Sequence, residues 1–216
     1  MAKLKKQHMT IHWKAIVQDD SSIPATEATL KEKATLVGRI GLMMLSVGTG
    51  AWRVRNSMNK VSRCLGITCT ADIGLLAISY TCIEGTDTYT QSISLPTTGV
   101  NTHKLMELEL FMKEFPDKVS TYSVKHIHEV LDEIQKLPAN YQAWNLGLAS
   151  ALACGAFTFL LGGGPVEMCC AFLGAGVGNF VRKKMLGHSI SLLANVAVSV
   201  AASCLVYVLT ILLAQS

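Results

Sequence analysis

The sequence predicts two regions of different fold class. An α+β soluble N-terminal domain is expected over residues 1–138, followed by an all-α transmembrane region of about three helices over residues 139–216. Three observations predict this division. The composition, 50% hydrophobic and 16% charged, is displaced toward membrane proteins. Nearly all charged residues precede Pro138, and the last third of the chain contains long stretches without charge.

Two short helices joined by a glycine turn are expected near the start of the N-terminal domain. Apolar residues recur at steps of four and three from Leu30 to Met44, which predicts a helix that faces a core. A second apolar stripe runs through residues 54–65. Thr49 is its expected N-cap, and Gly66 stands where a left-handed residue follows a helix end.

A small antiparallel sheet is expected after these helices. Residues 78–83 and 88–93 are rich in β-branched and aromatic types and alternate in polarity, with a turn between them. Residues 67–72 are a candidate third strand. Two further helices are then expected, the first ended by Pro116 and the second by Pro138. Helices and strands together predict the α+β class for this domain.

The last third of the chain predicts membrane spans. Residues 142–166 are free of charge and long enough for one spanning helix, and residues 189–216 are long enough for another. Residues 166–181, after a glycine-rich break, predict a shorter span between them. The basic group of residues 182–184 follows this middle span, and basic loops favour the cytoplasmic side. We therefore expect a multi-pass protein of the cell (inner) membrane whose N-terminal domain is cytoplasmic.

Four segments carry a resemblance to a known family. They are residues 48–54 (GTGAWRV) leading to residues 65–67 (LGI), the predicted strand pair, residues 131–134 (LDEI) on the approach to Tyr141, and residues 159–164 (FLLGGG). In order and spacing they resemble the threonine/serine exporter family, in the split form where a YjjP-like subunit carries the soluble domain and the first spans. Arg55 stands where the family pattern has an acidic residue.

The resemblance implies a secondary exporter that moves threonine, serine or dicarboxylates out of the cell with an ion gradient. Similar proteins continue into further helices that do not follow here, so the resemblance also implies a second small polytopic membrane subunit and an oligomer in the lipid bilayer. The alternative is a membrane-anchored cytosolic enzyme or sensor without transport activity. A degenerate subunit that no longer transports is a third possibility.

Five residues are candidates for a substrate or proton pathway: Glu167, Asn145, Asn179, Asn195 and Arg53. Glu167 is an isolated acid at the start of the middle span, where it fits proton coupling or, equally, the favourable N-terminus of a helix. The three amides fit a hydrophilic path or hydrogen bonds between helices. Arg53 fits a carboxylate ligand or a surface ion pair.

Other classes of function find no support in the sequence. Basic residues are scattered, so no nucleic-acid partner is expected. Walker, dinucleotide and nucleophile-elbow motifs are absent from the sequence, so we expect no enzyme and no cofactor. The seven cysteines form no CxxC pair and the histidines lack further ligands, so no metal site is expected.

Overall fold

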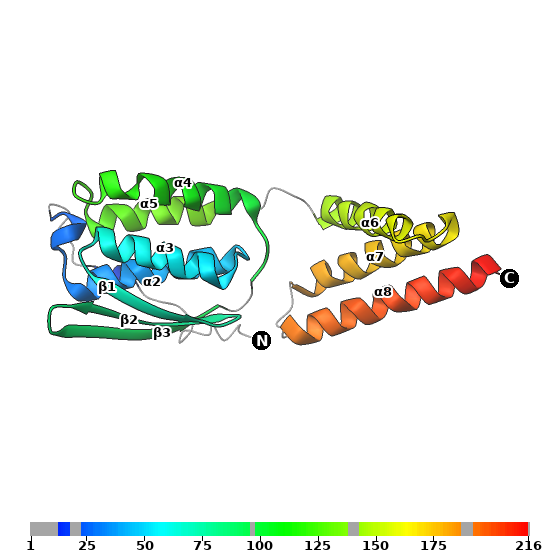
Figure 1. Cartoon of the computed structure of the whole chain (residues 1–216), viewed down its shortest axis with the longest axis horizontal. Coiled ribbons are helices and arrows are strands. Elements are labelled where there is room, and N and C mark those ends of the chain that lie inside the picture. The colour runs from blue at the N-terminus through cyan, green and yellow to red at the C-terminus, as the bar shows by residue number, and fades with distance from the viewer. Residues whose placement is uncertain (1–12, 18–22, 96–97, 138–142, 187–191, 216) are drawn as a thin grey trace. The chain divides into compact units, whose positions relative to one another are not determined.

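The computed structural model describes residues 13–17, 23–95, 98–137, 143–186 and 192–215. The chain divides into two compact units, Met1–Ala139 and Asn140–Ser216 (Figure 1). The domain boundary that we expected after residue 138 falls on residues 138–142, which lie outside the described residues.

Two helices form the centre of the N-terminal unit. Helix α2 (Leu30–Ser46) begins with a capping box, in which Thr29 and Glu32 satisfy each other's backbone N–H groups. Helix α3 (Ala51–Cys64) follows, and Gly66 after its end has a φ of 73°, as the sequence predicts. The predicted cap of α3 is wrong. The N-cap is Gly50, without a side-chain hydrogen bond, because Gly48 turns the chain with a φ of 78° and leaves the Thr49 hydroxyl buried.

A three-stranded antiparallel sheet lies against α2 and α3. Strands β1 (Thr68–Ile73), β2 (Ala77–Glu84) and β3 (Asp87–Ser94) are adjacent in chain order, so the predicted strands and turn are confirmed. The sheet face toward the helices is apolar and includes Tyr80, whose hydroxyl donates to Gln91 at 2.8 Å. The opposite face carries exposed hydroxyl pairs such as Ser79 with Ser92.

Helices α4 (Thr102–Lys118) and α5 (Val124–Lys136) form a third layer, on the side of α2 and α3 away from the sheet (Figure 1). Short elements α1 (Trp13–Ile16) and η2 (Ala25–Glu27) precede α2. We expected Pro116 to end α4, and this is wrong, because the helix continues to Lys118. A proline this near the C-terminal end removes a single backbone hydrogen bond in the last turn.

The second unit consists of three helices in the described range. Helices α6 (Ala143–Leu160), α7 (Pro165–Leu186) and α8 (Leu192–Gln215) are arranged with α7 in contact with both neighbours. Small residues allow these close approaches. Ala151 of α6 packs on Gly176, and a Cβ atom at Gly178 would lie 2.8 Å from the Ser203 side chain of α8.

The predicted fold class is wrong in both parts. The described structure is 70% helical with one small sheet, so the N-terminal unit does not form a clear α+β domain. In the second unit, one described helix, α8 at Leu193–Ala214, is long and apolar enough to cross a membrane. The apolar part of α6, Trp144–Leu160, is shorter. In α7, the uncharged stretch between Glu167 and Arg182 has about 14 residues and is about 21 Å long. This is shorter than the hydrocarbon layer of a bilayer, which is about 30 Å thick.

Candidate functional site

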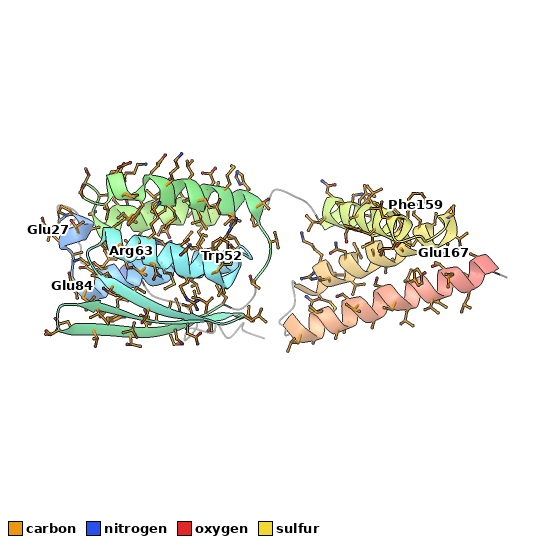
Figure 2. The ribbon with its side chains drawn as sticks, in the orientation of Figure 1. Glu27, Trp52, Arg63, Glu84, Phe159 and Glu167 are labelled. Carbon is orange, nitrogen blue, oxygen red and sulfur yellow. The ribbon has the colours of Figure 1, made fainter. Side chains whose placement is uncertain are left out.

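Glu167 lies at the break between α6 and α7 (Figure 2). Gly162, with a φ of 93°, turns the chain at the end of α6, and Pro165 starts α7 with its fixed backbone angle. The Glu167 side chain folds back over Gly164, where a Cβ atom would lie 2.7 Å from Oε2. The carboxylate therefore stands in the first turn of α7, where the helix dipole favours negative charge.

Asn179 and Asn195 each connect α7 to a neighbouring helix. The Asn179 amide Nδ2 donates to the Leu146 carbonyl of α6 at 3.3 Å. The Asn195 Nδ2 donates to the Arg182 carbonyl of α7, also at 3.3 Å. Asn195 is buried, and its Oδ1 has no hydrogen-bond partner among the described residues. The geometry matches hydrogen bonding between helices, with the Asn195 Oδ1 left as an acceptor in the α7–α8 contact.

The predicted membrane residues do not converge on one site. Glu167 and Asn179 are 12 residues apart on α7, which separates them by about 18 Å along the helix axis. Asn145 is exposed on α6. Glu167 is therefore apart from the amides, while Asn179 bonds to the residue after Asn145 and Asn195 bonds to α7 three residues after Asn179.

A groove of about 320 Å³ runs between α6 and α7. Its lining is apolar, with aromatic rings from Trp144, Phe172 and Phe180 over small residues such as Gly147. A hydrophilic solute would lose its hydrogen bonds to water there and gain none in return. This groove therefore does not serve as the path of a polar substrate.

Arg53 lies on α3 of the N-terminal unit and follows Trp52, which is labelled in Figure 2. Its Nη1 is 3.2 Å from the Glu109 carboxylate of α4, and its guanidinium lies 5.6 Å from the Trp52 ring. Both members of the ion pair are about half exposed. This geometry is that of a surface ion pair. Arg55, the departure from the family pattern, donates through Nε to the Ala71 carbonyl of β1.

A buried polar cluster between α2 and α5 was missed by the sequence analysis. The Arg39 side chain is fully buried and donates to the carbonyl of His128, to the Asp132 carboxylate and to the amide oxygen of Gln135. The Trp13 ring lies 4.6 Å from the guanidinium and stacks on His128. The available signal was a lone arginine inside an apolar helical stretch, together with an acid in residues 131–134.

The electrostatics of this cluster keep His128 neutral. The pKa of His128 is lowered to about 4, chiefly by burial and next by the positive charge of Arg39, while the charge of Asp132 opposes both effects. Burial also lowers the pKa of Arg39. The hydrogen bond to Asp132 and the charge of Asp132 raise it, but by less. Arg39 stays charged at neutral pH, since its ordinary pKa lies so high. The cluster is thus a charged arginine and aspartate beside a neutral imidazole.

Comparison with models of protein families shows which family the chain belongs to. The ThrE family model, described as "Putative threonine/serine exporter", matches residues 35–216. The chain belongs to this threonine/serine exporter family. The family resemblance drawn from the sequence is thereby confirmed. No match was found among curated proteins or solved structures.

Family membership gives the coarse function. The family is one of membrane transporters, so the chain is a membrane protein with a role in transport. It is not a family of enzymes. An exporter family also implies a small solute as substrate and a lipid environment. The match covers both units, since it takes in all of α3 to α8 and most of α2.

Proposed function

We propose that the chain is a subunit of a secondary exporter that moves small polar metabolites out across the cell membrane. Threonine and serine are the first substrates to test, and dicarboxylates are the second class. The observation that carries this proposal is the family match over residues 35–216. The second unit supports it, because α8 is long and apolar enough to span and many large apolar side chains of α6 to α8 are exposed, as contact with lipid requires.

The exporter subunit needs a partner to form a pathway. Helix α7 contacts both α6 and α8. The side-chain amides of Asn179 and Asn195 already donate hydrogen bonds between these helices. The groove between α6 and α7 is apolar. These contacts leave little polar wall for a solute at the middle of the bilayer. A second small polytopic subunit, in an oligomer with this chain, would supply the remaining helices.

The orientation follows from the charges at the end of α7. Arg182, Lys183 and Lys184 favour the cytoplasmic side for this end of α7, and we propose that the N-terminal unit is on the same side. Helix α8 then ends on the outer side. A cysteine introduced at position 183 should resist a membrane-impermeant thiol reagent in intact cells and react after lysis. Labelling in intact cells would refute this orientation.

Export itself is tested by co-expression with the candidate partner. Cells that express both proteins should hold less intracellular threonine or serine than cells that express either protein alone. Purified chain alone in liposomes should show no export, while the co-purified complex should export against a gradient. Full activity of the single chain would contradict the subunit role. If the complex exports neither threonine, serine nor a dicarboxylate, the proposed function is wrong.

Glu167 is the proposed proton or solute contact within this function. Glu167→Gln keeps the size of the side chain and removes its charge, so export should fall and its pH dependence should flatten. The matched control is Glu114→Gln, the same change at a residue of α4 that pairs with Lys118. If Glu167→Gln inserts normally and exports with an unchanged pH profile, Glu167 serves only the start of α7, as its position over Gly164 also allows.

A further inference from the structure

Two cysteines lie directly opposite each other in the sheet of the N-terminal unit. Cys69 is on β1, and Cys82 is its register partner on β2. Both are free thiols. Each is buried between more exposed neighbours, on the same sheet face as Tyr80, which packs toward α2 and α3. The strands therefore hold two thiols side by side under the helices.

The backbone places this pair at a spacing that suits a disulfide. The Gly74 N–H donates to the Ala77 carbonyl oxygen at 2.8 Å, so these two residues form a hydrogen-bonded pair at the β1–β2 turn. Hydrogen-bonded and non-hydrogen-bonded pairs alternate along an antiparallel ladder. Cys69 and Cys82 each stand about five residues from that turn pair, an odd offset, so they form a non-hydrogen-bonded pair with Cα atoms about 4.5 Å apart. Disulfides join Cα atoms that are about 4.4–6.8 Å apart.

The two thiols differ in acidity and in access to solvent. A hydrogen bond from Cys82 lowers the pKa of Cys69, although burial opposes this effect. The same contact raises the pKa of Cys82, and burial raises it further. Cys69 lies on the edge strand β1 and is 7% exposed, whereas Cys82 is 0% exposed. Cys69 is therefore the thiolate that a small oxidant meets first, and Cys82 is the thiol beside it.

We propose that Cys69 and Cys82 form a reversible disulfide when a small peroxide oxidises the N-terminal unit. The Cys69 thiolate attacks a peroxide oxygen and the O–O bond breaks. Cys69 becomes a sulfenic acid, and the departing oxygen takes up a proton to leave as water or an alcohol. Cys82 then attacks the Cys69 sulfur, loses its proton and releases the sulfenic oxygen as water. In total, two thiols are oxidised to one disulfide and one peroxide is reduced. A dithiol reverses the step by thiol–disulfide exchange and is itself oxidised to a disulfide.

The disulfide adds a covalent bond at the edge of the sheet. In the reduced protein, β1 is paired to β2 by backbone hydrogen bonds. The bond between Cys69 and Cys82 fixes this edge strand, so hydrogen exchange of the β1 amides should slow on oxidation. On the cytoplasmic side, thiols are kept reduced, so a disulfide there is transient and responds to oxidant. That last point depends on the proposed orientation, whereas formation of the disulfide does not.

The test counts free thiols in the reduced full-length protein in detergent, before and after treatment with hydrogen peroxide. N-ethylmaleimide labels the free thiols after unfolding in urea, and trypsin then releases residues 64–104 as one peptide with three cysteines, Cys64, Cys69 and Cys82. The reduced protein should give three labels on this peptide, and the oxidised protein one. A second cleavage before Asp72 separates Cys69 from Cys82, and the two fragments should stay linked. Dithiothreitol should restore all three labels.

Substitutions assign the bridge to this pair. Cys69→Ser and Cys82→Ser should each abolish it, and the matched control Cys64→Ser should keep it. A second control combines Cys82→Ser with Thr81→Cys, which moves the thiol by one residue to the other face of the sheet. This variant keeps the number of thiols, yet its bridged fraction should fall at least tenfold. Circular dichroism checks that each variant is folded.

Three outcomes overturn the inference. The first is an oxidised protein that keeps three labels on residues 64–104 while other cysteines of the chain lose theirs. The second is a bridge that includes Cys64, or a loss of label that dithiothreitol does not reverse. The third is wild-type bridging in the variant with the displaced thiol, because the register would then have no role. Export does not enter any of these measurements, so their result is independent of the proposed function.

Discussion

The two units of the chain bury opposite kinds of side chain. In the N-terminal unit, apolar side chains of α2, α3, α5 and the sheet form a common core. In the second unit, large apolar side chains face outward, with Leu161 87% exposed and Leu213 75% exposed, while Asn195 is only 2% exposed. This inversion is expected when the first unit is surrounded by water and the second by lipid.

The units also use small residues and charges differently. The N-terminal unit contains a fully buried arginine whose Nη atoms all contact α5. In the second unit the charged residues within the helices lie near the ends of α7, and the contacts between helices depend on glycine, alanine and serine. The first unit therefore adds a buried charged pair to its apolar core, whereas close backbone packing joins the helices of the second unit. Substitutions can test each half of this comparison.

The largest effect is expected at Arg39. Arg39→Met removes one member of a buried charged pair and leaves Asp132 and the His128 carbonyl without their donor. The free energy of unfolding should fall by about 3 kcal/mol, the lower end for a broken buried pair, because Asp132 is partly exposed. Urea unfolding of the full-length protein in detergent, followed by circular dichroism, measures this change.

The control for this prediction is Arg53→Met. Its ion pair with Glu109 is about half exposed on both sides, so the loss should stay below about 1 kcal/mol. Equal losses for the two variants would show that burial of Arg39 contributes nothing to the stability of the N-terminal unit.

Acid should destabilise the N-terminal unit through His128. The folded pKa of about 4 lies below the ordinary value of 6.5, because burial and then the charge of Arg39 oppose protonation. The unfolded chain therefore binds the proton first. Stability from the neutral ring is complete above pH 6.5 and is lost as the pH falls toward 4, by up to about 3 kcal/mol.

This pH dependence is measured as the free energy of unfolding between pH 7.5 and pH 4.5, with Trp13 emission as the local signal. The matched variant is His128→Asn, which lacks the titrating ring and should show a flatter profile over the same interval. A wild-type profile as flat as that of His128→Asn would contradict the role assigned to His128.

A smaller effect is expected where α2 meets the sheet. A Cβ atom at Gly38 would lie 2.2 Å from the Tyr80 hydroxyl, and Tyr80 is buried with its hydroxyl bonded to Gln91. Gly38→Ala should therefore cost about 2 kcal/mol through overpacking. Thermal unfolding measures it against Gly99→Ala, where no atom lies within 4 Å of the added Cβ. An unchanged melting temperature in Gly38→Ala would show that α2 can shift away from the sheet.

Local elements of the fold could be predicted from the sequence. The period of apolar residues in α2, the turn between β2 and β3 and the glycine after α3 each depend on neighbouring residues, and all three are confirmed. The end of α4 could not be predicted, because the effect of Pro116 depends on its distance from a helix end that tertiary packing sets. The overall class was wrong because three short strands carry clear patterns yet make up a small part of a mainly helical structure.

The polar contacts between distant residues could not be predicted from local sequence patterns. Arg39 and Asp132 are 93 residues apart, and helical periodicity cannot pair residues across that distance. A polar residue in an apolar stretch is visible in the sequence, and Asn195 was predicted in this way. The sequence pattern cannot show that the Asn195 amide donates to the Arg182 carbonyl. Whether Glu167 or Arg53 contacts a solute remains a prediction for the export assay.

The smallest effect is expected at the polar contact between α7 and α8. Asn195→Leu removes a long hydrogen bond of 3.3 Å to the Arg182 carbonyl, but it also removes a buried Oδ1 that has no partner among the described residues. These changes oppose each other, so the second unit should lose about 1 kcal/mol or less, the usual size of such bonds between membrane helices. Unfolding by sodium dodecyl sulfate in mixed micelles measures this loss, with Asn145→Leu at an exposed position as the near-neutral control. A loss as large as that of Arg39→Met would mean that polar bonds anchor both units alike, and the contrast between them would fail.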